Sequence, residues 1–479
     1  MGGVLMLILP EIIVALSGFA LLVIDLFLPE NKKHLLAPMA LIGILAALVS
    51  LIAILPESGT LFGGRFVINS ITTWFKILFL LGAAFTVALV WHAKKHEQIA
   101  SGGEFFVILL FTQVGMMALI SATELITLYI GLELSTIPLF ALAAWRRGDN
   151  LSGEAGLKYV LYGALASALL LYGLGILYGI TGHFELNLMR DHLATSPALW
   201  LAAALIISGV GFKLTLTPFH MWAADVYQGA PTPVTAYLSV ASKCAGLAFM
   251  FQLFLGVFGG QLSEWHWLIA LLATATMTLG NLVAIVQNNI KRFMAFSSIS
   301  QAGNLILGFL GPYPEGAPSM LFYLLGYAFT NMAVFGVIVW YADATGRSNI
   351  DEYKGLSRTN PLMALVMALA LFGLAGVPPM AGFVGKFFLF SIAAKAGMHW
   401  LVAVAAINST VSLYYYLRIV RAMYIEPPDA SFSRLPVSPV MQTTLWVATL
   451  GLVFLGILPF FYDIILRTTG NWMTVFAGM

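Results

Sequence analysis

Six ionisable residues stand inside long apolar runs of this sequence, where a charge is costly. Five are lysines and one is a glutamate: Lys76, Lys158, Lys213, Lys243, Lys386 and Glu133. An ammonium at the centre of a bilayer costs about 2.5–3.5 kcal/mol on insertion scales, so such residues are rarely retained without a function. Burial disfavours the charged form of a lysine and a nearby carboxylate favours it. The set therefore predicts proton or ion transfer through a membrane.

The composition predicts an all-α polytopic membrane protein. Of the 479 residues, 60 % are hydrophobic and only 9 % are charged, and the mean hydropathy is +0.93. A soluble protein could not hide so much apolar surface in one core. The single cysteine, Cys244, excludes a disulfide within the chain and a cysteine-ligated iron–sulfur or zinc site. Any redox chemistry coupled to this chain must therefore take place in another chain.

Apolar windows of about 20 residues predict fourteen transmembrane helices. Together they form one transmembrane domain over residues 1–479. The predicted spans are 4–28, 35–55, 69–91, 104–121, 123–144, 152–181, 198–227, 234–258, 264–287, 290–311, 317–342, 360–397, 399–424 and 438–466. Helices 1–3 fall within residues 1–100, and the last span, 438–466, stands alone at the C-terminal end.

Two of these spans are too long and contain proline near the middle. Proline removes a backbone donor and clashes with the preceding turn, so 198–227 breaks near Pro218 and 360–397 breaks near Pro378. Matching interruptions in two halves indicate an inverted-repeat transporter. We therefore predict two inverted five-helix repeats, helices 4–8 (104–258) and helices 9–13 (264–424), with broken helices 7 and 12.

The basic residues outside the apolar runs are unevenly divided between alternate loops. With the N-terminus outside, fourteen of them, Lys94 and Lys95 included, lie on the cytoplasmic side and four on the outer side. Cytoplasmic loops carry the excess of Lys and Arg in membrane proteins. The asymmetry predicts that both termini lie on the outer side.

Depth separates the buried charges into groups. Glu133 and Lys243 lie about ten residues inside their helices, roughly 15 Å from the nearer end, which is too deep to reach the surface. Lys213 and Lys386 lie beside the helix breaks, where freed carbonyl groups and water can solvate them. Glu133 and Lys213 are our candidate partner pair.

For the other candidates a structural interpretation competes with a functional one. Lys158 is only six residues inside its helix and could reach the inner headgroups. Lys76 has no charged neighbour in sequence, so we interpret it as structural, and we interpret Glu11 as interfacial. His220, in the first break, could bond a freed carbonyl or relay a proton.

Three long motifs are similar to those of the antiporter-like membrane subunits of respiratory complex I. They are GFKLTLTPFHMWAADVYQGAPTPV at 211–234, which continues to Lys243, NIKRFMAFSSIS at 289–300, and LAGVPPMAGFVGKF at 374–387. The resemblance extends from about residue 70 to residue 425. The motif at 227–234 and the run LYYYLR at 413–418 fit one branch of this family better than the other two.

The resemblance implies a role for each residue. Glu133 and Lys213 would form an input half-channel, Lys243 would lie at the centre, and Lys386 would be nearest the exit, while Lys158 matches a helix 6 lysine of some relatives. It also implies a non-redox subunit of a proton-translocating NADH:quinone oxidoreductase in the bacterial inner membrane. No cofactor is expected in this chain, because NADH, flavin, iron–sulfur clusters and quinone would belong to partner membrane-arm and redox subunits.

Position 301 departs from the family pattern. The family usually has histidine two positions after Ser-Ser-Ile, whereas this chain has Gln301. Glutamine does not take up and release a proton as imidazole does. We therefore predict that a link along the central axis runs here through water held by Gln301.

Two other functions remain open. A subunit of a multisubunit sodium/proton antiporter shares the same ancestry, and sodium-dependent transport without redox subunits would favour it. A stand-alone solute symporter would use the helix breaks as a substrate site and would need a polar or aromatic pocket there. The sequence has no glycine-rich nucleotide motif, nucleophile elbow or metal cluster, which argues against a self-contained enzyme.

Overall fold

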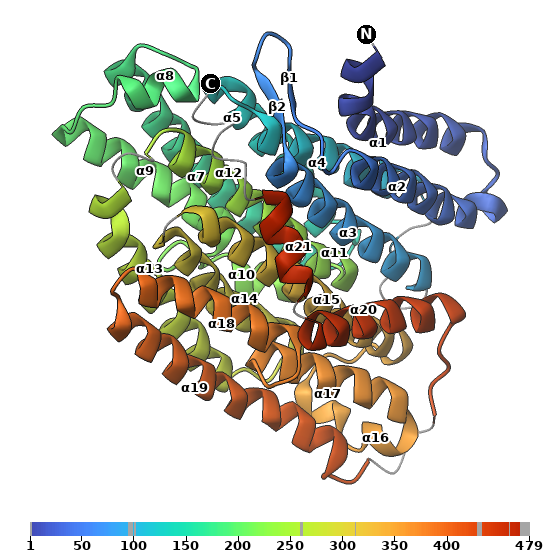
Figure 1. The fold of residues 1–479 in the computed structure, drawn as a ribbon. Helices are drawn as coiled ribbons and strands as arrows, with labels where there is room; N and C mark the ends of the chain where they lie inside the picture. Colours follow the sequence, from blue (N-terminus) through green and yellow to red (C-terminus); the bar gives the residue numbers. More distant parts are fainter. Residues whose placement is uncertain are drawn as a thin grey trace.

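The protein is a helical bundle with a small β-hairpin formed by β1 and β2 (Figure 1). The computed structural model describes residues 2–93, 99, 102–258, 262–311, 313–428, 434–458 and 460–469. The elements up to the middle of the chain are α1 (Gly2–Phe27), η1 (Glu30–Leu35), α2 (Leu36–Ala53), β1 (Gly59–Leu61), β2 (Phe66–Ile68), α3 (Ser70–His92), α4 (Glu104–Ser121), α5 (Leu125–Leu134), α6 (Ile137–Ala143), α7 (Asn150–Thr181), α8 (Leu186–Asp191), α9 (Pro197–Leu214), α10 (Ala223–Gly229), α11 (Thr232–Tyr237), η2 (Leu238–Ser242) and α12 (Lys243–Gly256).

The second half continues in the same manner. Its elements are α13 (Leu262–Ile285), α14 (Ile290–Leu305), η4 (Ile306–Phe309), α15 (Tyr313–Thr345), η5 (Ile350–Tyr353), α16 (Leu356–Thr359), α17 (Pro361–Ala375), α18 (Ala381–Lys395), α19 (His399–Tyr424), α20 (Pro439–Ile457) and α21 (Phe460–Thr469). The two strands pair antiparallel, with Gly59 opposite Ile68.

Twelve helical segments of the described chain are long and apolar enough to cross a membrane. The multi-pass helical prediction is confirmed, but the count of fourteen is not. One of the two remaining predicted spans, 290–311, contains α14, whose 16 residues extend only about 24 Å, less than the hydrocarbon thickness of about 30 Å. The other, 360–397, is divided into α17 and α18, of 15 residues each.

Both predicted helix breaks are present and end in the same way. Helix α9 stops at Leu214 and is followed by Thr215 in the left-handed conformation, with φ 60°. Helix α17 stops at Ala375 and is followed by Gly376, with φ 84°. A left-handed residue after the last turn is a common helix end, because it turns the chain away from the helix axis. The broken helices 7 and 12 are therefore confirmed.

A third break was missed by the sequence analysis. The predicted single span 123–144 consists of α5 and α6, and the helix is interrupted at Ser135 and Thr136. Pro138 stands in the first turn of α6, where its missing N–H is tolerated. The break places the backbone and hydroxyl oxygens of these two residues inside the bundle.

The centre of the bundle is the segment Thr232–Phe254, which is wholly buried. It includes the π-helical turn η2 directly before Lys243. The long helix α15 packs against this segment and also contacts α3, α17, α18 and α20. Single π-turns often occur at functional sites, because the wider turn redirects side chains.

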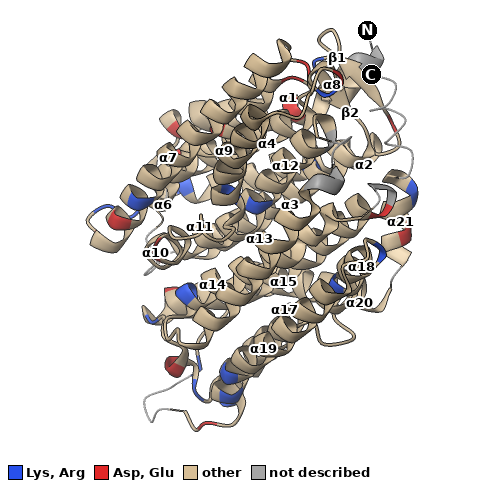
Figure 2. Cartoon of the chain, turned by 90° about the vertical axis from the view of Figure 1, so that its left-hand side faces the viewer, with Lys and Arg blue, Asp and Glu red and all other residues tan. Residues whose placement is uncertain are grey.

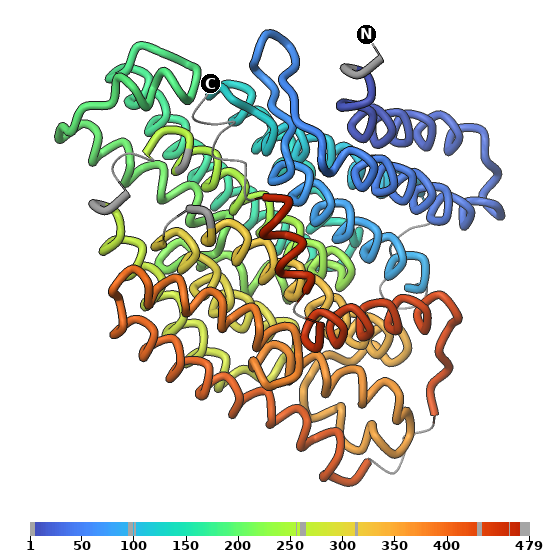
Figure 3. The backbone as a smooth tube through the Cα atoms, in the orientation of Figure 1, coloured from blue at the N-terminus to red at the C-terminus, as the bar shows by residue number. Residues whose placement is uncertain are grey.

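Helices α1, α2 and α19 lie at the periphery of the bundle (Figure 3). The hairpin of α1 and α2 lies at one edge and α19 at the opposite edge (Figure 3). Most Lys, Arg, Asp and Glu residues lie near the ends of the helices, and a few basic residues lie in the interior of the bundle (Figure 2).

Candidate functional site

Lys213 reaches from the last turn of α9 into the break between α5 and α6. Its side chain is buried, with 3 % of the residue exposed. Its Nζ donates to Thr136 Oγ1 at 2.5 Å and lies 3.4 Å from the carbonyl oxygen of Ser135. Two interrupted helices therefore supply the lysine and its acceptors. Thr136 was not predicted as a site residue, although Pro138 was the signal for the break that exposes it.

Glu133 lies near Lys213 but is not bonded to it. Its Oε1 accepts a hydrogen bond from Ser167 Oγ at 2.5 Å, and Ser167 Oγ lies 2.9 Å from the Tyr129 hydroxyl. Among the described residues no ion pair joins Glu133 to Lys213, whose ammonium bonds Thr136 instead. The predicted pair is therefore not a direct contact, because the break in the helix places Thr136 against the lysine.

Lys243 occupies the centre of the bundle. It follows the π-turn η2, is 2 % exposed, and its Nζ donates to the carbonyl oxygen of Ser298 in α14. The Ser298 hydroxyl lies 2.9 Å from the Tyr327 hydroxyl of α15 and 3.4 Å from that of Tyr227. Lys243 therefore joins the first half of the chain to α14 through neutral groups.

Lys386 bonds the end of the other broken helix. It is 5 % exposed, and its Nζ donates to the carbonyl oxygens of Leu374 at 2.9 Å and Ala375 at 3.2 Å. These are the last two residues of α17, whose terminal carbonyl groups have no partner within the helix. The negative end of a helix dipole attracts a cation, so the ammonium of Lys386 and the end of α17 attract each other.

Gln301 contacts the same helix end. Its Nε2 donates to Leu374 O at 2.9 Å and to the Tyr416 hydroxyl at 3.3 Å, and its Oε1 accepts from the Tyr323 hydroxyl at 2.5 Å. Both N–H groups are thus bonded to protein atoms. The structure therefore brings Gln301 and Lys386 together on one carbonyl, and the water link through Gln301 stays a prediction.

Lys158 lies in a cluster at the edge of the bundle. Its Nζ is 2.6 Å from Asp225 and 2.6 Å from Glu154, and its side chain is 36 % exposed. Arg292 Nη1 contacts the other oxygen of Asp225 at 2.5 Å. These ion pairs connect α7, α10 and α14. Lys158 is therefore set apart from the buried lysines.

His220 lies in the break between α9 and α10 and is mostly buried. Its Nδ1 makes no hydrogen bond within the described structure. Its position agrees with both interpretations given above, since it stands among freed backbone groups but bonds none of the lysines.

Lys76 and Glu11 form an ion pair that the sequence analysis did not predict. Lys76 is completely buried and its Nζ lies 2.6 Å from Glu11 Oε1, an oxygen of helix α1. The Phe66 ring of β2 lies 5.2 Å from the same Nζ. Glu11 is therefore a buried partner of Lys76. The two are far apart in sequence, so no local pattern could show the pair.

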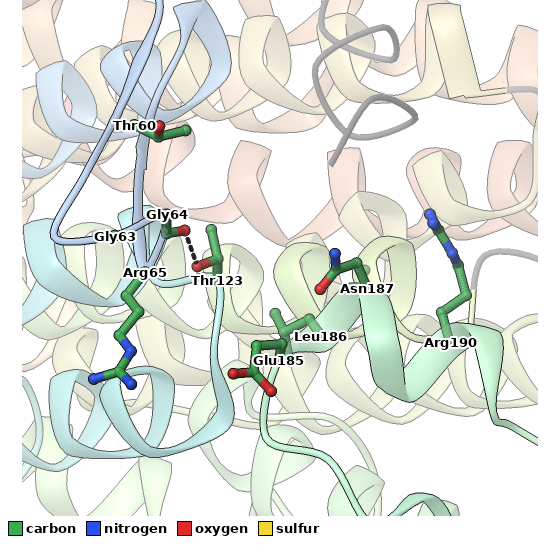
Figure 4. A pocket seen from close by; sticks show the side chains of 10 residues that line it. Thr60, Gly63, Gly64, Arg65, Thr123, Glu185, Leu186, Asn187 and Arg190 are labelled. Carbon is green, nitrogen blue, oxygen red and sulfur yellow. Dashed lines mark hydrogen bonds between the residues drawn. The ribbon is translucent and has the colours of Figure 1, made fainter.

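A surface cavity of about 380 Å³ lies between the β-hairpin and α8 (Figure 4). Its polar lining includes Arg65, Thr123, Glu185 and Arg190, and Thr123 Oγ1 donates to the Gly64 carbonyl at 2.7 Å. The two arginine side chains point in different directions, and the cavity includes no residue of the helix breaks. It therefore does not supply the pocket that the symporter interpretation requires.

Among the described residues no group of three or more His, Cys, Asp or Glu side chains could hold a metal ion.

Comparison with known proteins gives the family. The family model described as "NADH:quinone oxidoreductase/Mrp antiporter, TM" matches residues 122–412, which include every predicted site residue. The NADH-quinone oxidoreductase subunit N of Trichlorobacter lovleyi is 40 % identical over 459 residues, and the alignment covers 94 % of each chain. This chain belongs to the NADH-quinone oxidoreductase subunit N family.

Further relatives agree with subunit N. The subunit N of Moorella thermoacetica is 42 % identical over 452 residues, and the alignment covers 94 % of each chain. A chain of the solved respiratory complex I from Thermus thermophilus is 33 % identical, with a TM-score of 0.81, and the match covers 96 % of this chain and 98 % of that one. The branch predicted from residues 227–234 and 413–418 is thereby confirmed.

Proposed function

We propose that this chain moves protons across the membrane as the subunit N of an NADH:quinone oxidoreductase, driven by redox chemistry in partner subunits. The chain itself carries out no redox step. Family membership supports the assembly, and the row of buried lysines supports proton transfer as its contribution.

The observation that carries the proposal is the nature of the lysine partners. Lys213, Lys243 and Lys386 are each buried, and each donates to neutral oxygen atoms of hydroxyl or carbonyl groups. A carboxylate in direct contact would hold the ammonium form firmly, whereas neutral acceptors leave the balance to burial and to more distant charges. Such lysines can exchange a proton when a nearby charge moves.

The order of transfer follows the order of the elements. Glu133 and Lys213 belong to the input half, with Ser167 and Thr136 as their hydrogen-bond partners. Lys243 takes up the proton at the centre of the bundle, and Lys386, at the second helix break, is the last lysine before the exit. His220 and Lys158 lie near the input half, and we assign the Lys158 cluster a structural role because its charges are already paired.

The proposed location of the chain is the inner membrane of a bacterium. Both termini lie on the outer side, since the distribution of basic residues favours that orientation. Two of the residues counted for it, Lys94 and Lys95, lie outside the described residues. Its partners are other membrane-arm subunits, and NADH, flavin, iron–sulfur clusters and quinone belong to the remaining subunits.

The test replaces a buried lysine in the complete complex. Lys213→Met should abolish or strongly reduce NADH-driven proton uptake by membrane vesicles, because methionine keeps the length of the side chain but cannot carry a proton. Lys395→Met is the matched control, since Lys395 is an exposed lysine that pairs with Glu315. Unchanged proton-to-electron stoichiometry in the Lys213 variant would contradict the proposal.

A sodium/proton antiporter subunit is the second candidate, because the matching family model also covers Mrp antiporters. It predicts that vesicles carrying the assembly exchange sodium for protons without NADH. Proton uptake that requires NADH and is independent of sodium would favour the first function.

A further inference from the structure

One backbone carbonyl receives two side chains from different helices. Lys386 Nζ and Gln301 Nε2 each lie 2.9 Å from the carbonyl oxygen of Leu374. A carbonyl oxygen has two lone pairs, so both donors can bond it at once. Lys386 comes from α18 and Gln301 from α14, so one carbonyl at the end of α17 receives side chains from two neighbouring helices.

The end of α17 needs these donors. The carbonyl oxygens of Phe372 and Gly373 accept from the backbone N–H groups of Gly376 and Val377. In the described structure the Leu374 and Ala375 carbonyls accept only from side chains, namely Lys386 for both and Gln301 for Leu374. A bare carbonyl inside a membrane protein is costly, because no bulk water can replace the lost bond.

Gln301 is fixed in a pose that keeps it on this carbonyl. The Tyr323 hydroxyl donates to Oε1 at 2.5 Å, and the second N–H of the amide is directed to the Tyr416 hydroxyl at 3.3 Å. Tyr416 in turn lies 2.5 Å from Ser297 Oγ. All of these groups are buried, and a primary amide keeps its donors at every physiological pH.

We propose that Gln301 is a positioning residue, which keeps the Leu374 carbonyl hydrogen-bonded when Lys386 moves away from it. Tyr323 and Tyr416 keep the Gln301 amide in the orientation that this role requires. The inference rests on the proposed function, in which Lys386 exchanges its proton. When Lys386 loses its charge or swings toward the exit, Gln301 still satisfies the helix end. The lysine is then free to move without leaving a bare carbonyl behind.

This role accounts for the departure of position 301 from the family pattern. The amide does not carry the proton, and Lys386 does not have to pass its proton to this position. Gln301 instead lowers the cost of the state in which Lys386 is away from α17. Both amide N–H groups bond protein atoms, which agrees with a positioning role.

The first test is a thermodynamic cycle on the purified full chain. Gln301→Leu leaves Leu374 capped by Lys386, and Lys386→Met leaves it capped by Gln301, whereas the double variant leaves it bare. The loss of Tm in the double variant should therefore exceed the sum of the two single losses. Strictly additive losses would overturn the inference.

The matched control uses another buried glutamine. Gln252 Nε2 donates to the Ile120 carbonyl of α4, and among the described residues no hydrogen bond joins Gln252 to α17. Gln252→Leu combined with Lys386→Met should give additive losses of Tm. Non-additive losses here would mean that the cycle reports general loosening of the bundle, and would overturn the inference.

The second test reads out transport in the complete complex. In Gln301→Leu, release of the carbonyl by Lys386 is harder, so NADH-driven proton uptake should slow several-fold and its pH profile should move to higher pH. Gln301→His retains an N–H donor and should restore both rate and profile. A leucine variant with the wild-type rate and pH profile would refute the role of Gln301, while normal pumping by Lys386→Met would refute the proposed function instead.

Discussion

The buried ion pair between Lys76 and Glu11 gives the sharpest test of the fold. The pair joins α3 to α1, with 2.6 Å between Lys76 Nζ and Glu11 Oε1. Of the twelve helical segments that could span the membrane, α1 is the least buried. Lys76→Met would remove the ammonium and keep a side chain of similar length. The carboxylate of Glu11, whose side chain is 11 % exposed, would then remain in the bundle without its partner.

The expected loss is large because the two charges share one buried site. Removing one partner of a buried ion pair typically destabilises a protein by about 3–5 kcal/mol, since it leaves an uncompensated buried charge. Replacing both partners with apolar residues of similar volume is often neutral or stabilising. Glu11→Leu together with Lys76→Met should therefore recover most of the stability that Lys76→Met alone loses.

The assay is denaturant unfolding of the purified chain in detergent micelles, with the midpoint converted to a free energy difference. Lys395→Met is the control, since Lys395 and its partner Glu315 are both exposed and surface pairs contribute about 0–1 kcal/mol. The reasoning fails if Lys76→Met loses no more than Lys395→Met. It also fails if the double variant is less stable than the single one.

Three further substitutions test the transport path in vesicles of the complete complex. Lys386→Arg should impair NADH-driven proton uptake, because guanidinium does not deprotonate, and full activity would mean that only fixed charge is needed there. Glu133→Gln should keep the Ser167 contact but remove the negative charge that favours the ammonium of Lys213, so a wild-type coupling ratio and pH dependence would remove Glu133 from the path. Asp225→Asn should leave proton uptake nearly unchanged and cost about 1 kcal/mol or less in denaturant unfolding, because its ion pairs are partly exposed, and a strong loss of uptake would place the cluster on the path.

The sequence predicted the parts of the site that have a local signal. A lysine inside an apolar run and a proline at mid-helix can both be recognised within one segment, so Lys213, Lys386 and their breaks were found before the structure. The break at Ser135 had only Pro138 as a signal. It was missed because the apolar run continues through it, and hydropathy averages over a window longer than the break.

Contacts between distant segments could not be predicted. Glu11 and Lys76 are 65 positions apart, and no sequence pattern in either helix indicates that the two side chains are in contact. The shared Leu374 carbonyl is a backbone group, and backbone groups carry no residue signature. The same limit applies to Glu133 and Lys213, since two opposite charges at similar depth predict attraction but do not show the hydroxyl group of Thr136 that lies against the lysine.

The two helix breaks accommodate their lysines in different ways. Lys213 bonds a hydroxyl, and a hydroxyl can both accept from an ammonium and donate to the lone pair of a neutral amine. Lys386 bonds two carbonyl oxygens, which only accept, at the negative end of α17. Thr136 can therefore bond Lys213 in either charge state, whereas the carbonyl groups of α17 offer no donor to the lone pair of a neutral Lys386. A proton for Lys386 must therefore come from a group other than the end of α17.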